Sequence, residues 1–160
     1  MTDFALSWTM SRQRFVDEIK DLNAAQLNWK IHQGALSIGQ MAMHVAGVEV
    51  SFTSQLKGLE LSGLEAKIKS AAADGIVNDH PFPFADEEIT PASVAEVLEI
   101  AKTVAGPLIT EPSEQELGGQ VKSVLGPIID GKGVLTRLGF HAAYHQGQAY
   151  TYKTSPNFPK

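Results

Sequence analysis

The chain has 160 residues, of which 43% are hydrophobic and 19% are charged. This length suits one domain, expected to span residues 1–160, and the composition excludes an intrinsically disordered protein. The net charge is -5 and the sequence has no run of Lys and Arg, so nucleic acid is not expected as a partner. No stretch approaches the roughly 18 apolar residues that a membrane span requires, so no membrane partner is expected either.

The sequence contains no cysteine, which excludes disulfides, thiolate metal ligands and a cysteine nucleophile. Any thiol chemistry must therefore use a thiol from another molecule. Residues 1–4 lack the basic and apolar regions of a secretory leader. We therefore expect a cytoplasmic protein.

The first helix is predicted over about residues 4–22, where apolar side chains return to one face at helical spacing. The opposite face of this helix holds Arg12. Asn23 is a candidate N-cap for a short turn at residues 24–27, because its side chain can accept a hydrogen bond from the first backbone N–H groups.

The second helix is predicted to start at Ser37. Ser37 and Gln40 form a capping-box pattern, in which each side chain satisfies a backbone N–H of the other residue. An apolar stripe then continues at spacings of three and four residues to about Gly58. Residues 59–89 are interpreted as a long connection interrupted by glycines and prolines, within which residues 61–73 can form a loose helix.

Thr90 and Pro91 are the predicted N-cap and first residue of the third helix. Its apolar stripe continues to Leu108, and Pro107 is expected to bend or end the helix. Residues 111–126 are expected to form a polar loop.

Asp130 is the predicted N-cap of a fourth helix, which reaches about Lys153. No strand pattern competes with this interpretation. The predicted fold is therefore all-α, a four-helix bundle with its long connection between the second and third helices.

His141 and His145 stand four residues apart on the fourth predicted helix, which places both imidazoles on one face, one turn apart. Such a pair can supply two nitrogen ligands to one metal ion, which then needs a ligand from another element. His44 lies at the margin of the apolar stripe of the second helix and is the candidate third ligand. Three histidines leave coordination positions open for water or a substrate atom.

A second interpretation stays open, in which each histidine lies at the edge of the core and is satisfied by a hydrogen bond. Pairs of histidines at this spacing also arise by chance. However, three inward imidazoles would each need a polar partner in an apolar bundle, and one shared cation meets that need.

Two further histidines, His32 and His80, are predicted to lie in loops as solvated residues outside the site. Glu49 lies about 140° around the second helix from His44, so a solvated position is expected for it rather than a role as a ligand.

Gln148 is nearly in line with His141 on the fourth helix. It can hydrogen-bond a bound water, a group behind the ligands or a backbone carbonyl. Tyr144 lies about 100° from His145 around the helix, and we expect it to pack or to contact a dimer partner rather than act as a general acid.

Residues 37–45, SIGQMAMHV, and residues 141–148, HAAYHQGQ, resemble the two signatures of the DinB-like family. The turn at residues 27–29, the long connection and the placement of the histidine pair are also similar, so the resemblance covers nearly the whole chain. It implies a bacterial protein with an up-up-down-down four-helix bundle. It also implies a divalent metal bound by His44, His141 and His145.

The sequence departs from the commoner family motif at Tyr144 and Gln146, where an additional His and an Arg often stand. The three ligand positions are unaffected. A cationic Arg beside the site could hold an anionic substrate, and this sequence has Gln146 in its place. The resemblance therefore does not extend to that role.

The superfamily that this chain resembles includes bacillithiol- and mycothiol-dependent S-transferases and maleylpyruvate isomerase. We therefore expect a metal-dependent enzyme acting on a small-molecule substrate. In it, zinc, nickel or iron would lower the pKa of a bound low-molecular-weight thiol or water.

Two alternatives remain. A metal-dependent hydrolase needs a nearby general base, and no Asp or Glu is predicted to face inward beside the three histidines. A non-catalytic bundle would use the metal to join its helices, or would bind a ligand without turnover. In each case we expect a homodimer, formed through the first and fourth helices, because amphipathic bundles often pair through an extra apolar face and the resemblance points the same way.

Overall fold

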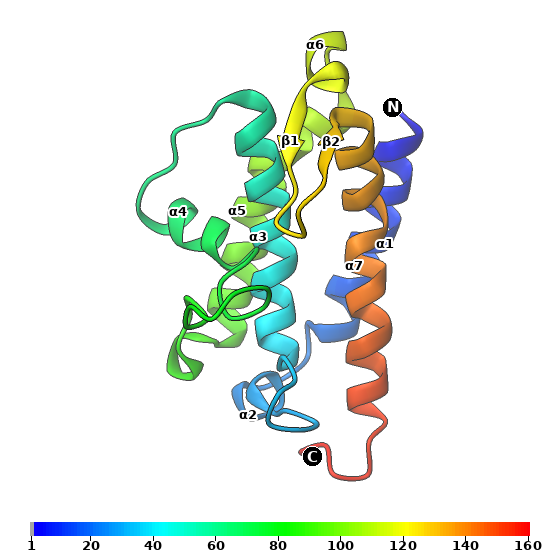
Figure 1. Cartoon of the computed structure of the whole chain (residues 1–160). Helices are drawn as coiled ribbons and strands as arrows, with labels where there is room; N and C mark the ends of the chain where they lie inside the picture. Colours follow the sequence, from blue (N-terminus) through cyan, green and yellow to red (C-terminus); the bar gives the residue numbers. More distant parts are fainter. Residues whose placement is uncertain (1) are drawn as a thin grey trace.

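Four long helices form a bundle in this computed structural model, which describes residues 2–160. They are α1 (Asp3–Ile19), α3 (Ile38–Lys57), α5 (Pro91–Thr110) and α7 (Gly131–Lys153). The helices α1 and α3 each pack mainly against α5 and α7 rather than against each other (Figure 1). The predicted all-α four-helix bundle is therefore confirmed.

The directions of the helices differ from the expected up-up-down-down order. The amine of Lys153, at the end of α7, donates to the backbone carbonyl of Glu18, at the end of α1, so these helices are parallel. The Thr2 hydroxyl, at the start of α1, donates to the carbonyl of Ile109, at the end of α5, so α1 and α5 are antiparallel. In Figure 1, α1 and α7 run downward while α3 and α5 run upward, so the order along the chain is down, up, up, down.

The connections explain this order. The segment between α1 and α3 is short and holds only the small helix α2 (Ala24–Asn28), so it reverses the chain at one end of the bundle. The long connection holds α4 (Gly63–Ser70) and the 3-10 turn η1 (Asp86–Glu88). It returns the chain to its starting end, and α5 consequently runs parallel to α3.

The ends of the helices follow the local sequence signals. Ser37 and Gln40 form the predicted capping box before α3, and Asn23 caps α2 in the same way. Asp130 accepts a hydrogen bond from the third residue of α7. Of the two alternatives for Pro107, ending the helix is excluded, since α5 continues to Thr110; a proline removes one backbone donor without preventing a further helical turn.

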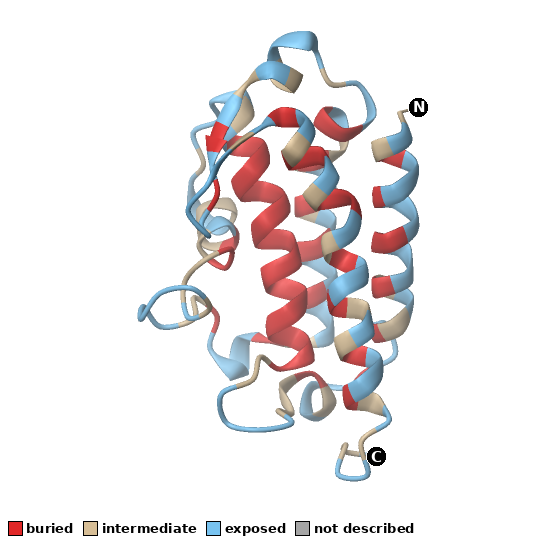
Figure 2. Cartoon of the chain, turned by 45° about the vertical axis from the view of Figure 1, so that its right-hand side comes forward, coloured by how far each residue is buried: buried red, intermediate tan, exposed pale blue. Residues whose placement is uncertain are grey.

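The helix α3 is buried all round rather than along one stripe. All residues from Ile38 to Ser54 are buried (Figure 2). The helices α5 and α7 cover one side of it and α4 covers another. The long connection therefore encloses α3 and shields its polar residues from water.

A short antiparallel hairpin corrects the expectation that no strand is present. The helix α6 (Glu114–Gly118) is followed by β1 (Gln120–Lys122) and β2 (Ile128–Asp130), with Val121 opposite Ile129. Three residues are too few to show an alternating pattern, so the sequence does not reveal these strands. Gly126 adopts a φ of 109° at the turn, which favours glycine.

A buried ion pair joins α1 to α3. The Arg12 Nε donates to Glu49 Oε1 at 3.1 Å, and the indole Nε1 of Trp8 donates to the same oxygen at 2.7 Å. The Arg12 guanidinium also donates to the carbonyl of Leu98 on α5. The predictions that Arg12 lies on the outer face and that Glu49 is solvated were wrong, because helix contacts across the bundle decide which faces are covered.

No helix within residues 2–160 is both long and apolar enough to cross a membrane.

Candidate metal centre

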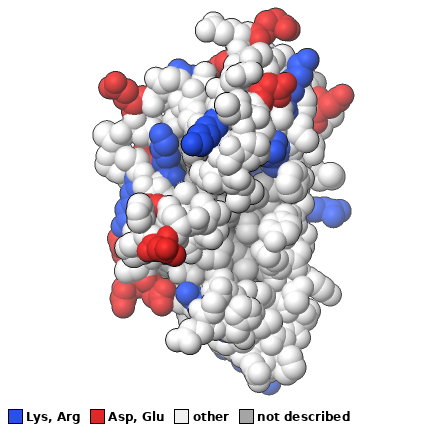
Figure 3. Space-filling model, in the orientation of Figure 1, with Lys and Arg blue, Asp and Glu red and all other residues white. Residues whose placement is uncertain are grey.

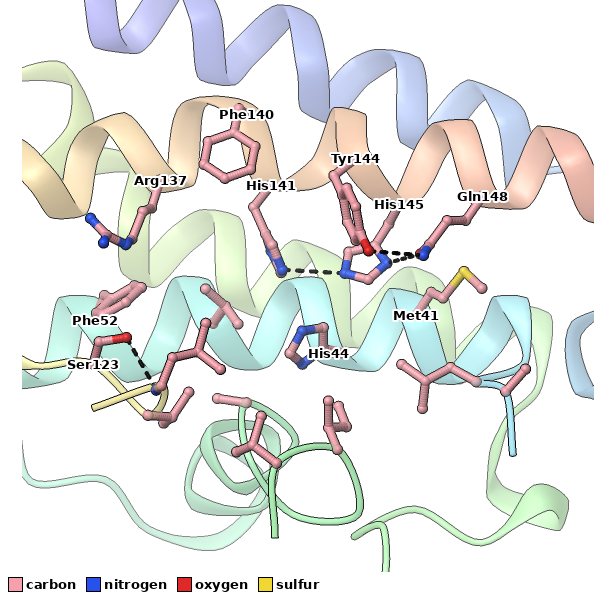
Figure 4. A pocket seen from close by; sticks show the side chains of 18 of the residues that line it. Met41, His44, Phe52, Ser123, Arg137, Phe140, His141, Tyr144, His145 and Gln148 are labelled. Atoms are coloured by element: carbon pink, nitrogen blue, oxygen red, sulfur yellow. Dashed lines mark hydrogen bonds between the residues drawn. The ribbon is translucent and has the colours of Figure 1, made fainter. Parts of the chain in front are cut away.

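Three imidazoles meet between α3 and α7. His141 and His145 occupy successive turns of α7 and point toward α3, where His44 faces them (Figure 4). The Nε2 atoms of His141 and His145 are 3.2 Å apart. The ring centroid of His44 lies 4.9 Å from that of His141 and 5.2 Å from that of His145. The structure therefore brings the three histidines singled out by the sequence into one cluster.

A backbone carbonyl fixes the orientation of His44. Its Nδ1 donates to the carbonyl of Ala71 at 2.9 Å, and because a carbonyl only accepts, the neutral ring must carry its proton on Nδ1. Gly47, one turn further along α3, allows this approach: a Cβ there would lie 2.6 Å from the backbone N of Ala72 and 2.7 Å from the carbonyl oxygen of Ile68. The close packing thus directs the Nε2 lone pair of His44 toward α7.

A side chain on α7 fixes His145 in the same manner. Gln148 Oε1 lies 2.8 Å from His145 Nδ1 and accepts its proton, while Gln148 Nε2 donates to the Tyr144 hydroxyl at 3.2 Å. Gln148 therefore hydrogen-bonds the back of a candidate ligand, which was one of its predicted alternatives. Tyr144 is largely exposed and lies beside the cluster.

Burial keeps all three imidazoles neutral. An imidazolium is poorly solvated between the helices, so burial lowers the pKa of His141 to about 2 and that of His145 to about 4. The neighbouring imidazoles strengthen both shifts. Burial also lowers the pKa of His44, against the effect of the Ala71 carbonyl. Neutral imidazole is the form that binds a metal ion.

The donor set fits a divalent transition metal. The three ligand nitrogens all lie within 4.8 Å of one another, and nitrogens around a tetrahedral zinc ion are about 3.3 Å apart when each bond is about 2.0–2.1 Å. The His141 to His145 separation already has this value. His141 Nδ1 is buried without a hydrogen-bond partner in the described chain, so His141, unlike His44 and His145, is held by packing and not by a hydrogen bond behind the ring.

A pocket of about 600 Å³ opens onto the three histidines. Its walls are mainly apolar, and Phe52, Phe140 and the hairpin residue Leu125 contribute to them (Figure 4). Such a cavity has the size and character of a small-molecule site. No Asp or Glu is among the pocket's lining residues in the part of the chain that the structure describes.

The two loop histidines differ in position. His80 is exposed and its ring pairs with Asp74 at 3.2 Å, away from the cluster. His32 is exposed too, as expected, although it is among the residues that line the pocket. Neither belongs to the group of three.

Arg137 is a pocket residue that the sequence analysis missed. It lies four residues before His141, and this spacing, which repeats that between His141 and His145, was the available signal. By contrast, Gln146 faces α1 and donates to Glu18 at 3.1 Å. Gln146 therefore joins α7 to α1, and the positively charged side chain of the pocket is Arg137 instead.

The lowered pKa values predict that acid destabilises the metal-free protein. Below pH 6.5 the unfolded chain binds protons on these histidines that the folded chain does not, so the free energy of unfolding falls as the pH decreases from 6.5 toward 4. Urea unfolding at pH 7.5, 6.0 and 5.0 measures this slope. His141→Leu should flatten it, whereas His80→Leu should not; equal slopes in all three proteins would contradict the assignment.

Comparison with known proteins identifies the fold. No protein-family model matches the sequence, and no curated protein matches it significantly. Among solved structures, a DinB-like protein from Bacillus cereus ATCC 10987 is similar, with a TM-score of 0.65 and 18% sequence identity over 98% of this chain and 94% of that chain. The DinB-like fold expected from the sequence is thereby confirmed.

Proposed function

We propose that this chain is a DinB-like protein that binds one divalent transition metal through His44, His141 and His145 and uses the adjoining pocket to activate a small thiol for transfer to an electrophile. The observation that carries the proposal is a cluster of three neutral imidazoles, two buried and one half-buried, at the wall of an apolar pocket, with His44 and His145 oriented through Nδ1. Three ligands suit a site with open positions better than a closed structural site.

The metal would supply one chemical effect, since a bound divalent cation favours the deprotonated form of a thiol or water molecule near neutral pH. Gln148 and the Ala71 carbonyl hold the imidazoles of His145 and His44 in place. The apolar walls exclude water from the reacting groups and strengthen the local electrostatics.

The transfer itself forms a bond between the thiol sulfur and an electrophilic carbon, while the leaving group departs with its electron pair. The thiol proton must leave the pocket. The Tyr144 hydroxyl accepts from Gln148, so its own proton can be donated to a leaving group and is replaced from the solvent to which Tyr144 is exposed. This general-acid role is one that the sequence did not favour. The chain has no cysteine, so the nucleophilic sulfur belongs to a second small molecule.

The lack of carboxylates among the described pocket residues favours thiol transfer over hydrolysis. Hydrolysis needs a general base within hydrogen-bond reach of the attacking water. Glu49, the buried carboxylate nearest in sequence to His44, is occupied by Trp8 and Arg12. A hydrolase and a non-catalytic binding bundle remain the alternative functions.

A titration of Co²⁺-loaded protein with small cellular thiols tests the proposal. Thiolate coordination produces charge-transfer bands in the near-ultraviolet, and an electrophile such as monochlorobimane then reports turnover. Bands followed by thiol consumption are expected. Bands without turnover would indicate a binding protein, and neither bands nor consumption with Zn²⁺, Ni²⁺, Fe²⁺ or Co²⁺ would contradict the transferase.

We also propose that the chain forms a homodimer in which α1 takes part. Leu6 and Met10 lie on successive turns of α1 and are 57% and 61% exposed, although both are apolar. Covering such a face is a common reason for pairing. Sedimentation that returns only a 17.2 kDa species over a wide concentration range would rule the dimer out.

A further inference from the structure

Arg137 places one positive charge at the end of the metal pocket. It lies on α7 one turn before His141, on the same side of the helix (Figure 4). Four residues of helix rise about 6 Å. The backbone positions of Arg137 and His141 are therefore about one helical turn apart, and the Arg137 guanidinium, which reaches the Gly133 carbonyl, lies further toward the start of α7.

The guanidinium has no carboxylate partner among residues 2–160. Its one hydrogen bond there is from Nη1 to the carbonyl of Gly133, at 3.2 Å, within its own helix. Arg137 takes part in no ion pair of the described chain, whereas Arg12 is paired with Glu49. Most of the five donors of Arg137 are thus free to bind a ligand.

The surroundings of the pocket add to this charge rather than neutralise it. No Asp or Glu is among its described lining residues to neutralise the guanidinium, and no Lys is there to compete with it for an anion. Uncharged side chains border the hollow on this face of the molecule, and basic side chains lie above it (Figure 3). A partly buried arginine facing apolar walls attracts an anion more strongly than one in open water.

We propose that Arg137 binds a carboxylate of the substrate, so that the pocket selects amphipathic small molecules with an anionic group at one end and the reacting group at the other. The planar guanidinium donates two parallel N–H bonds to a carboxylate. The apolar segment between the two ends packs against Phe52, Phe140 and Val48. This inference rests on the proposed function in taking the pocket as the substrate site, and it adds the substrate class.

Two probes of equal shape test it on metal-free protein at pH 7.5: 4-phenylbutanoate and 4-phenylbutan-1-ol, with affinities measured by calorimetry. The wild type should bind the carboxylate about tenfold or more tightly than the alcohol. Arg137→Gln should reduce the ratio to about twofold or less, and Arg137→Lys should retain part of it, because an ammonium keeps the charge without the planar fork. Circular dichroism establishes that the variants are folded.

Lys122→Gln is the matched control, since Lys122 is an exposed cation on β1 outside the pocket lining. It changes the net charge equally and should leave the preference intact. The proposal is overturned by equal binding of the two probes to the wild type, by binding of neither, or by a preference that persists in Arg137→Gln. A protein that shows the preference but never binds Zn²⁺ would overturn the proposed function and leave the carboxylate site standing.

Discussion

Glu49→Ala is expected to lower the free energy of unfolding by about 3–5 kcal/mol, because it leaves the Arg12 guanidinium buried without its carboxylate. Burial raises the pKa of Glu49, and the positive charge of Arg12 opposes that rise, together with the hydrogen bonds from Trp8 and Arg12. Each buried charge therefore depends on the other. Removing one of them lowers the stability by more than the intact pair adds to it. Urea unfolding monitored by circular dichroism measures the loss.

Two comparisons isolate the cause of this loss. Glu99 is an exposed residue whose pairing with Lys102 lies at the surface of α5, so Glu99→Ala should change the stability by less than about 0.5 kcal/mol. The double variant Arg12→Met with Glu49→Leu should regain much of the loss, because apolar side chains need no partner. A Glu49→Ala protein as stable as Glu99→Ala would contradict the account of this pair.

The helix starts and the histidine cluster were predictable because their signals are local. Ser37 and Asp130 cap helices through bonds to residues three positions away. His141 and His145 share a face by spacing alone. The convergence with His44 needed only the assumption that apolar stripes face one another.

Other features depend on how distant segments meet. The burial of Arg12 and Glu49 follows from the way their side chains meet across the bundle, beside α5. The need for a glycine at position 47 becomes visible only when the backbone at Ala72 lies against it. The helix order could not be read from periodicity, which gives the faces of helices but no directions. Arg137 carried a helical-spacing signal, yet an arginine at that spacing is ordinarily a surface residue.

His141→Ala is expected to weaken Zn²⁺ binding by more than about 100-fold, because it removes one of the three proposed protein ligands. Gln148→Ala should weaken it by about 10–100-fold, since Gln148 orients His145 without touching the metal. Competition with a chromophoric chelator measures both affinities. His80→Ala is the control and should bind as the wild type does.

Anomalous diffraction from crystals of the Zn²⁺-loaded protein tests the central claim most directly. One zinc peak per chain is expected between α3 and α7, about 2.0–2.1 Å from a ring nitrogen of each of His44, His141 and His145. A peak held by other residues, such as the exposed His80 and Asp74, or none at the three histidines after saturation with zinc, would contradict it.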